Sequence, residues 1–257
     1  MKEESKDYTV DMDEILDALN EEALIEDPHK GKKKCFIRLF ALLLVITFTA
    51  LMFNNILAFF NMPSLDFILD SREISKDPEI QSWQQAVVAI RTPNSRGTGF
   101  NISSHGTIIT NYHIVEGAKN VVVTFSSNGQ YNVYEWISFP EIDLAIISLD
   151  ANALPALSLE KQKTPAIGDE VTIIGNPLGF TRIVNKGEFS GYTRLRDWQI
   201  PVLMIKGSIH KGNSGSPVIN ADGNVIGMVF ATAANNQHED DIIGLAVPIS
   251  EIIKKLK

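Results

Sequence analysis

The order of hydrophobic and polar positions divides the chain into stretches of different texture. Residues 1–34 are mostly polar and residues 35–60 are almost entirely apolar, whereas from residue 83 onward short apolar runs alternate with Gly, Pro, Asn and Asp. A long unbroken apolar run favours a helix in a nonpolar medium, and short runs between turn residues favour β-strands. We therefore expect one long apolar helix followed by an all-β unit.

The apolar stretch at 35–60 has the length of a transmembrane helix. It reads CFIRLFALLLVITFTALMFNNILAFF, without a charged residue between Leu39 and Phe53. About 20 apolar residues cross a bilayer core of about 30 Å, and Arg38 can extend its side chain to the interface. A buried helix of a soluble core normally has a polar face, and a secretory signal peptide has a shorter leader and a small-x-small cleavage site. We expect a retained signal anchor, with these two as the alternatives.

The flanking charges predict the orientation of this segment. Four lysines and Arg38 lie near its start, whereas five acidic residues and two basic ones occupy residues 61–82. Positively charged flanks stay in the cytoplasm, so we expect a cytoplasmic acidic tail at 1–34, a polar spacer at 61–82 and an extracytoplasmic remainder. Apolar residues at helical spacing in the tail predict either a solvated, partly helical segment or a docking helix for a cytoplasmic partner.

Residues 83–257 have the pattern of two β-barrels. Six strand-like runs lie between residues 86 and 149, and a second set of about six lies between residues 170 and 247. Strands at this spacing, with few helical stretches, indicate a barrel or sandwich. We predict two six-stranded antiparallel β-barrels, one at about 83–160 and one at about 165–257, with a short C-terminal helix at SEIIKKLK.

Composition and charge narrow the classes of function. The 257 residues carry 23 basic and 31 acidic side chains, a formal charge of −8, and 44% are apolar. This apolar content excludes a fully disordered chain. The single cysteine, Cys35, excludes a disulfide-stapled scaffold and a cysteine-ligated zinc site. The acidic balance, without a long basic block after the apolar stretch, argues against nucleic acid as a partner.

The segment GNSGSP at 212–217 is the strongest local signal for chemistry. Glycines on both sides of Ser214 allow a tight turn that exposes the hydroxyl and directs neighbouring N–H groups to one point, as an acyl-transfer nucleophile requires. A polar turn between strands is the alternative for this motif alone. A nucleophile elbow of the α/β-hydrolase type is disfavoured, because Ser216 stands where the second glycine is needed and a strand follows.

A serine nucleophile needs a base and a carboxylate that orients the base. His113 ends a strand-like run and begins a short helical turn, where a rigid scaffold presents catalytic groups. The other histidines, in the tail or in loop-like segments, are His29, His105, His210 and His238. Asp143 directly precedes an apolar strand, with Glu141 and Asp150 as local competitors. The order His113, Asp143, Ser214 is that of chymotrypsin and differs from the orders in subtilisin and the α/β-hydrolases.

Four segments in this order resemble the HtrA/Deg group of trypsin-like serine proteases. They are GTGFNISSHGTIITNYHIVEGA, EIDLAIISLD, IIGNPLGF and GNSGSPVINADGNVIGM. The resemblance covers residue 83 to the C-terminus. It implies a chymotrypsin-like fold with a site between two barrels, an endopeptidase active on proteins or peptides in quality control or regulated proteolysis, and a homotrimer. It implies no cofactor and no metal ion.

The resemblance also implies a role for each matching residue. His113 would act as general base and acid, Asp143 as its orienting partner and Ser214 as the nucleophile. The backbone N–H groups of Gly212 and Ser214, with Asn213 between them, would form the oxyanion hole.

By the layout of the family, the primary substrate pocket would be lined by the loop before the nucleophile and by one strand of the second barrel. These positions are Ser208, His210, Lys211, Val229, Phe230 and Ala231. Because position 208 carries no Asp to pair with a basic side chain, we expect an apolar or small residue before the scissile bond.

Two positions depart from the family pattern. Ser216 replaces a usual glycine, which would store strain if the backbone there needs a positive φ, and Lys211 replaces a frequent proline. The sequence ends after the closing strand and helix of the family, so we expect no PDZ module.

The combined prediction is a membrane-anchored extracytoplasmic serine endopeptidase. One alternative is a catalytically silent binding or signalling module built on the same barrels. Another is an enzyme whose loops at 182–200 and 207–213 become ordered only with an effector. The run His238–Asp241 contains four metal-ligand residue types, but contiguous residues in a loop are more often solvated, and we expect no metal site there.

Overall fold

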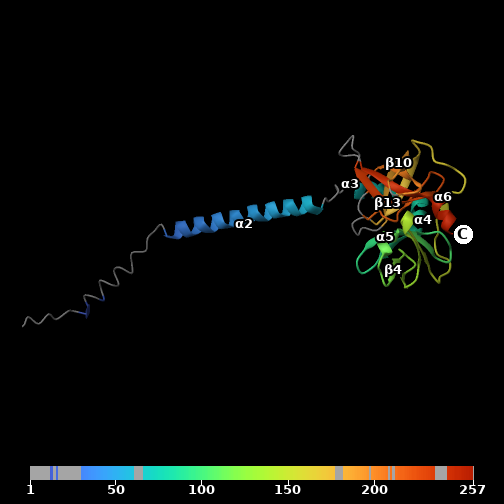
Figure 1. Cartoon of the computed structure of the whole chain (residues 1–257). Helices are drawn as coiled ribbons and strands as arrows, with labels where there is room; N and C mark the ends of the chain where they lie inside the picture. The colour runs from blue at the N-terminus through green and yellow to red at the C-terminus, as the bar shows by residue number, and fades with distance from the viewer. Residues whose placement is uncertain are drawn as a thin grey trace, which may run out of the picture. The chain divides into compact units, whose positions relative to one another are not determined.

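In the computed structural model, the chain divides into two compact units, residues 1–62 and residues 63–257 (Figure 1). The residues described are 12–13, 16, 30–60, 66–176, 182–196, 198–207, 209, 212–234 and 242–256.

The first unit contains one long helix, α2 (Lys30–Phe60), of 31 residues. Large apolar side chains between Leu39 and Phe53 are exposed, nearly all by more than half of their surface. Thr47 and Thr49 donate their hydroxyls to the carbonyls one turn earlier, at 2.8 and 2.7 Å, so both polar groups are satisfied within the helix. Among the residues described, no helix combines the length and the hydropathy that crossing a bilayer requires.

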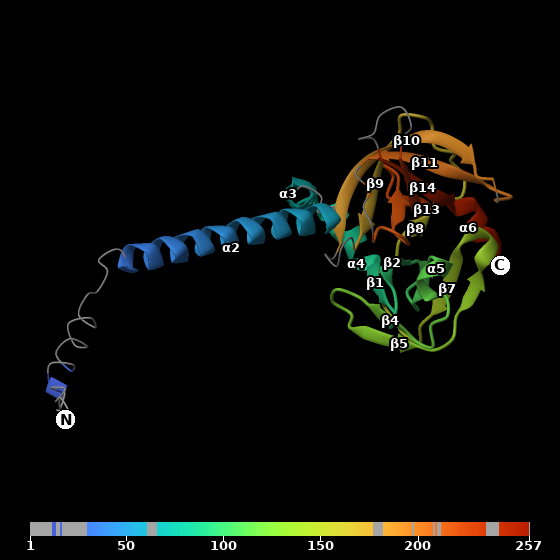
Figure 2. The ribbon, with the colours of Figure 1, turned by 60° about the vertical axis from the view of Figure 1, so that its left-hand side comes forward.

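The second unit contains two β-sheets, which Figure 2 shows as two lobes, one above the other. The first sheet is antiparallel, in the order β5-β4-β1-β2-β3-β7-β6. Its strands are β1 (Val87–Arg91), β2 (Arg96–Asn101), β3 (Thr107–Thr110), β4 (Val121–Thr124), β5 (Gln130–Val133), β6 (Ile137–Phe139) and β7 (Leu144–Ser148). Because side chains alternate between the two faces of a strand, the alternating apolar residues of β4 are buried on one face only.

The second sheet has the order β12-β9-β10-β11-β14-β13-β8 and closes on itself because β12 also pairs with β13. Its strands are β8 (Ser158–Leu159), β9 (Glu170–Gly175), β10 (Ile183–Arg194), β11 (Pro201–Gly207), β12 (Pro217–Ile219), β13 (Asn224–Ala234) and β14 (Ile242–Pro248). β8 pairs with β13 in parallel. A turn at Asp222-Gly223 connects β12 to β13, and Gly223 has the positive φ of +79° that such a turn requires.

Buried apolar residues form three clusters that hold the sheets together. One lies inside the first sheet and includes Ile90, and one lies inside the second sheet and includes Phe189. The third joins both sheets and includes Phe100 of β2 and Ile174 of β9. A site between the two sheets therefore rests on a continuous hydrophobic core, which fixes the sheets relative to each other.

Short helices complete the second unit. They are α3 (Asp66–Ile74), α4 (Pro78–Ala86), α5 (Tyr112–Val115), the 3-10 helix η1 (Pro140–Ile142) and α6 (Ile249–Lys255). α3 and α4 lie largely in the segment expected to be a polar spacer. Ile74 of α3 and Ile80 of α4 contribute to the hydrophobic cluster that joins the two sheets, so both helices pack on the sheets. α4 begins at Pro78, with the Asp77 carboxylate accepting the N–H of Glu79 at 2.8 Å as its cap.

The structure confirms the predicted all-β architecture with a short C-terminal helix, but the strands are distributed differently. The second sheet closes into a barrel of six strands, as predicted, with β8 added at its edge, whereas the first sheet has seven strands among the described residues and is not closed by strand pairing. The first sheet gains its seventh strand because residues 130–139 form two strands, β5 and β6, and the connection between the sheets contributes β8. The last helix, α6, begins at Ile249, which is buried, and its N-cap residue is Pro248.

Candidate active site

His113 and Asp143 form a close carboxylate–imidazole pair. Asp143 Oδ2 lies 2.7 Å from His113 Nδ1, and Asp143 Oδ1 accepts the backbone N–H of His113 at 2.9 Å. The side chain of Asp143 is 14% exposed and that of His113 is 44% exposed. The carboxylate is therefore shielded, whereas the imidazole reaches solvent with its Nδ1 edge fixed. This arrangement lets the ring exchange a proton through Nε2.

The backbone of Asp143 is also held in place. It adopts φ 48°, in the left-handed region that Asp tolerates better than most residues. Its carbonyl accepts the backbone N–H of Tyr112 at 3.1 Å and the side-chain Nδ2 of Asn111 at 3.0 Å. Asp143 thus contacts three consecutive residues at the start of α5, which fixes the direction of the His113 side chain.

Glu141 and Asp150, the alternatives to Asp143 as the carboxylate that orients His113, lie at other places in the fold. Glu141 accepts a hydrogen bond from Lys255 Nζ at 2.8 Å, which lowers the pKa of the Glu141 carboxyl and ties it to α6. Asp150 lies beyond the opposite end of β7. His105 contacts only its neighbour Ser104 among described residues, at 3.3 Å. His29, His210 and His238 lie outside the described residues.

Ser214 lies in a tight turn between two glycines of positive φ. Gly212 has φ +101° and Gly215 has φ +83°, values that side chains rarely allow. A Cβ at Gly215 would overlap the carbonyl oxygen of Thr98, so only glycine fits there. The N–H of Gly215 donates to the carbonyl of Val229 at 2.8 Å. The tight turn expected from the sequence is therefore present, and a hydrogen bond attaches it to β13.

Thr98 of β2 ties this turn to the first sheet. Its backbone N–H donates to the carbonyl of Ser214 at 2.9 Å, and its hydroxyl donates to the carbonyl of Gly212 at 3.0 Å. The same hydroxyl accepts the backbone N–H of Asn176 at 2.9 Å and its Nδ2 at 3.3 Å. A hydroxyl can donate one hydrogen bond and accept two, so the Thr98 hydroxyl makes all the hydrogen bonds that it can.

Thr98 and Asn176 are residues of the site that sequence reasoning missed. Thr98 lies within β2, between Gly97 and Gly99, and Asn176 directly follows Gly175 at the end of β9. Thr98 is completely buried and Asn176 is 9% exposed. A polar residue within or directly after an apolar strand could have indicated them in the sequence. Buried polar side chains normally make a specific hydrogen bond.

Ser214 and the helix that carries His113 both approach β2 at Gly97. A Cβ at Gly97 would overlap the side chain of Ile114, the residue after His113, and would lie 3.3 Å from the carbonyl oxygen of Ser214. Among the described residues no hydrogen bond joins His113 to Ser214. Such bonds are often long before substrate binds and shorten in the reacting complex.

Two buried polar side chains of the nucleophile turn crowd the end of β9. A Cβ at Gly175 would overlap both Ser216 Oγ and Asn213 Oδ1, so the missing side chain provides their space. Asn213 and Ser216 are completely buried, and these atoms have no hydrogen-bond partner among the described residues. Ser216 is not among the residues with positive φ, so the strain considered for this departure from glycine is absent.

The expected substrate-pocket residues are described only in part. Val229 is buried, and Phe230 and Ala231 are half-buried in β13, at an irregularity of its pairing with β14. The Phe230 ring stacks on Trp198, with ring centroids 4.5 Å apart and planes at 21°. Ser208, His210 and Lys211 lie outside the described residues, as does the run at 238–241. In the part of the chain that the structure covers, no group of His, Cys, Asp and Glu has a metal-binding arrangement.

Comparison with protein families and curated proteins identifies relatives of this domain. The family model for a trypsin-like peptidase domain matches residues 97–228. A probable periplasmic serine endoprotease DegP-like from Halomonas elongata is 36% identical over 136 residues, covering 52% of this chain and 29% of that protein. The protein of the same name from Chlamydia muridarum is 34% identical over 164 residues, covering 62% and 32%. The chain thus spans about a third of the length of these relatives.

Comparison with solved structures supports the chymotrypsin-like fold. An inactive form of Rv3671c from M. tuberculosis H37Rv superimposes with a TM-score of 0.61 and 26% identity, over 71% of this chain and 90% of that one. The HtrA-type protease AlgW with a decapeptide has a TM-score of 0.61 at 23% identity, over 69% and 65%. At that identity the second likeness concerns the fold alone.

Proposed function

Because the chain belongs to the family of trypsin-like peptidase domains, we propose that it is a serine endopeptidase that cleaves peptide bonds through an acyl-enzyme on Ser214. The observation that carries this proposal is the double contact of Asp143 with His113, through Nδ1 and through the backbone N–H. A merely structural ion pair does not need both contacts, whereas a general base needs a fixed ring orientation.

In the proposed mechanism, His113 Nε2 removes the proton from Ser214 Oγ as that oxygen attacks the substrate carbonyl carbon. Asp143 accepts the Nδ1–H and stabilises the imidazolium that forms. His113 then gives the proton to the leaving amine, and the acyl-enzyme remains on Ser214. A water molecule, deprotonated by the same ring, attacks the ester carbon and releases the acid, which returns His113 and Ser214 to their starting forms.

The tetrahedral intermediate carries a negative oxygen, which needs preorganised donors. We assign this task to the backbone N–H groups of Gly212 and Ser214. The hydrogen bonds from Thr98 to the carbonyls of these two residues support the assignment. They hold the peptide groups 212–213 and 214–215, which adjoin the peptide groups that carry the N–H of Gly212 and the N–H of Ser214.

The nucleophile is tested with a fluorophosphonate probe, which labels only an activated serine. We expect the full chain to be labelled, and Ser214→Ala to abolish labelling without a change in thermal unfolding. Ser104→Ala, at an exposed serine of the β2–β3 turn, is the matched control and keeps wild-type labelling. His113→Ala lowers the labelling rate by several orders of magnitude, because the residues of a triad act as a unit. Labelling of Ser214→Ala at the wild-type level contradicts the proposal, and a folded wild-type chain that is never labelled favours the silent binding module.

The membrane anchor is part of the same proposal. The helical conformation of residues 35–60, the exposure of the apolar side chains from Leu39 to Phe53 and the internally bonded threonine hydroxyls all suit a lipid environment. The lysines before residue 35 then place the tail at 1–34 in the cytoplasm and the protease unit outside it. Two relatives carry the word periplasmic in their names, which agrees with this location.

The topology is tested in intact cells. We expect the chain to stay in the membrane after carbonate extraction, and an externally added protease to degrade an epitope at the C-terminus but not one at the N-terminus. Release by carbonate, or protection of the C-terminal epitope, would contradict the anchor or its orientation.

We further propose misfolded or regulatory proteins near the membrane as substrates, cleaved after apolar or small residues, and a homotrimer as the working assembly. The half-buried Phe230 and Ala231 beside the nucleophile turn support an apolar pocket. A peptide library with equal or faster cleavage after Lys and Arg would contradict this preference, and a monomeric mass in solution would contradict the trimer.

A further inference from the structure

A polar cavity lies on the second unit, where α3 and α4 meet the start of β10 and the β4–β5 turn. Its volume is about 550 Å³. Nine of its ten lining residues are polar: four serines, three glutamines and two arginines, with no Asp or Glu among them. Ligand cavities are usually lined mainly by apolar side chains. A hollow formed almost entirely by hydrogen-bonding groups and two positive charges therefore fits a polar anionic ligand.

The two arginines, Arg72 of α3 and Arg182 before β10, are the positive groups of this cavity. Among the described residues neither guanidinium has a carboxylate partner. Of the acidic groups on α3 and at the start of α4, Glu73 pairs with Lys76 at 2.5 Å and Asp77 caps α4, and neither these two nor Asp70 lines the cavity. The cavity therefore has an uncompensated positive charge from residues that are 110 positions apart in the sequence.

The backbone of Arg182 is kept in an unfavourable conformation at the cavity wall. Its φ is +55°, in the left-handed region, which costs a residue with a Cβ about 1 kcal/mol or more. Two hydrogen bonds hold it there: its N–H donates to Asn176 Oδ1 at 3.0 Å, and its carbonyl accepts from Gln84 Nε2 at 2.8 Å. Backbone strain that neighbouring groups enforce is more common at functional sites than elsewhere.

Hydrogen bonds within the chain hold the other walls of the cavity in place. Gln84 Nε2 also donates to Ser75 Oγ at 3.1 Å, and Gln81 Nε2 donates to the Ser75 carbonyl at 3.0 Å. Ser71 Oγ accepts the backbone N–H of Val184 at 2.9 Å and so joins α3 to β10. Preorganised walls reduce the entropy that binding must overcome.

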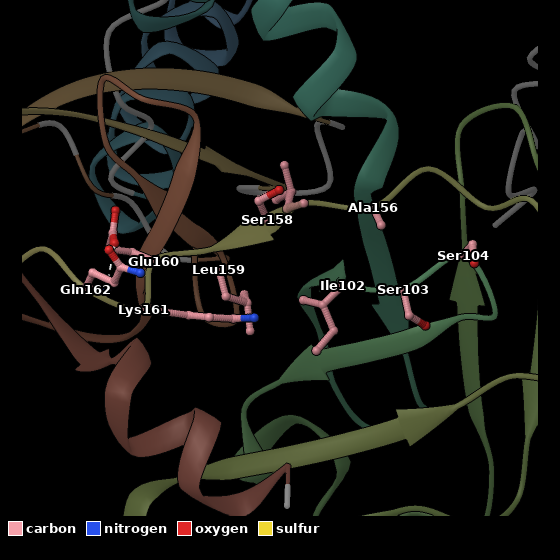
Figure 3. Close-up of a pocket in the computed structure, with 10 residues that line it drawn as sticks. Ile102, Ser103, Ser104, Ala156, Ser158, Leu159, Glu160, Lys161 and Gln162 are labelled. Carbon is pink, nitrogen blue, oxygen red and sulfur yellow. Dashed lines mark hydrogen bonds between the residues drawn. The ribbon is translucent and has the colours of Figure 1, made fainter.

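A second cavity, of about 620 Å³, differs from the first in the charge of its lining residues (Figure 3). It lies between Ile102, Ser103 and Ser104 on one side and residues 156–162 on the other. Its one carboxylate, Glu160, accepts the backbone N–H groups of Gln162 and Lys163 at 2.9 and 3.0 Å, which lower its pKa. The charge of Glu160 is therefore used within the chain, whereas the charges of Arg72 and Arg182 are not.

We propose that the cavity between α3, α4 and β10 is a binding site for an oxyanion of the phosphate class, held by the guanidinium groups of Arg72 and Arg182. The planar fork of an arginine matches two phosphate oxygens at once, and two forks balance the charge of a phosphate dianion or phosphodiester pair. The serine hydroxyls and the Gln85 amide supply neutral donors, whereas both Nε2 hydrogens of Gln84 are already donated within the chain.

Two sources carry this chemistry, a phospholipid headgroup and a free phosphate. Arg72 follows the end of α2 by 12 residues, a distance of at most about 40 Å along an extended chain. If α2 is the membrane anchor proposed above, headgroups are within reach of the cavity. The experiment therefore separates the two sources.

The test uses the full chain in non-ionic detergent at constant ionic strength, with chloride as the reference anion. Inorganic phosphate and pyrophosphate are titrated, and heat of binding and thermal unfolding are measured. We expect saturable binding with a raised unfolding midpoint. Arg72→Gln and Arg182→Gln each weaken the affinity at least tenfold, whereas Arg182→Lys, which keeps the charge and the strained position, weakens it less.

Arg194→Gln is the matched control, since Arg194 is an exposed arginine of β10 outside the cavity. It keeps wild-type affinity. Equal affinity in all arginine variants, or no saturable binding of either anion, overturns the proposal. In nanodiscs of phosphatidylglycerol, loss of phosphate binding by the wild type identifies the headgroup as the occupant, and undiminished phosphate binding identifies the free anion; both results support the site.

Discussion

The hydroxyl of Thr98 links the nucleophile turn to both sheets, and Thr98→Val removes that hydroxyl while keeping the shape of the side chain. In the wild type it donates to the Gly212 carbonyl at 3.0 Å and accepts two hydrogen bonds from Asn176 at 2.9 and 3.3 Å. The backbone hydrogen bond from Thr98 to the Ser214 carbonyl does not depend on the side chain and stays. The substitution therefore releases one end of the oxyanion loop and leaves the other attached.

The expected magnitude follows from the groups left without partners. A buried polar group that loses its hydrogen bond costs about 1–3 kcal/mol. The Gly212 carbonyl and the Asn176 N–H both lose a bond to Thr98, so we expect about 2–4 kcal/mol of destabilisation, or a midpoint lowered by about 5–15 °C for a unit of this size. If the Gly212–Asn213 peptide group rotates, the adjoining N–H groups of Gly212 and Ser214 lose their alignment, and misplacing one oxyanion donor costs about 100-fold in rate.

The assay compares the rate of fluorophosphonate labelling with the midpoint of thermal unfolding in the same preparations. Thr98→Ser keeps the hydroxyl and should recover most of the labelling rate, which a purely structural role of the γ-methyl group would not produce. Thr124→Val is the matched control: Thr124 is half-buried on β4, and its hydroxyl has no hydrogen bond to a described residue. We expect it within about 0.5 kcal/mol of the wild type. Wild-type labelling by Thr98→Val, even with a lower midpoint, would refute the positioning role.

Three further substitutions test the site and its support. Asp143→Asn should slow labelling by about 10⁴-fold with little change in unfolding, because an amide selects the wrong tautomer of His113. Gly175→Ala should lower both stability, by about 1–3 kcal/mol, and labelling, because the methyl group would overlap two buried polar side chains of the nucleophile turn. Glu141→Gln should cost less than about 1 kcal/mol at neutral pH, since the ion pair with Lys255 is partly exposed. Lys255 lowers the pKa of Glu141, so this stabilisation is present above the unfolded pKa and is lost as the pH falls through the folded one.

Each of these expectations has a contrary result. Labelling of the Asp143 variant at the wild-type rate would show that the carboxylate does not orient the ring. A Gly175 variant that unfolds and reacts like the wild type would show that the turn has spare room. For Glu141, the unfolding midpoints of wild type and variant should converge as the pH falls below the folded pKa, which lies under the ordinary value of Glu, and a difference that persists in acid would assign the effect to packing.

The sequence determined the features that depend on local pattern. The apolar run before residue 61 predicts the long helix α2, because it has no polar face. The alternating runs after residue 83 predict strands, since side chains of a strand alternate between faces. The two glycines around Ser214 predict the tight turn, because the required positive φ excludes other residues.

The tertiary structure decided what depends on contacts between distant positions. Local pattern favoured Asp143 but kept Glu141 and Asp150 as competitors, and only the position of α5 against η1 brings the Asp143 carboxylate to His113. Thr98 reaches Asn176 across 78 positions and Gly212 across 114, and neither bond leaves a mark in the neighbouring sequence. Arg72 and Arg182 are also far apart in the sequence. They line one cavity because α3 packs against β10. The periodicity of apolar residues predicts which face of a helix or strand is buried. Which buried faces contact each other depends on the packing of the whole core.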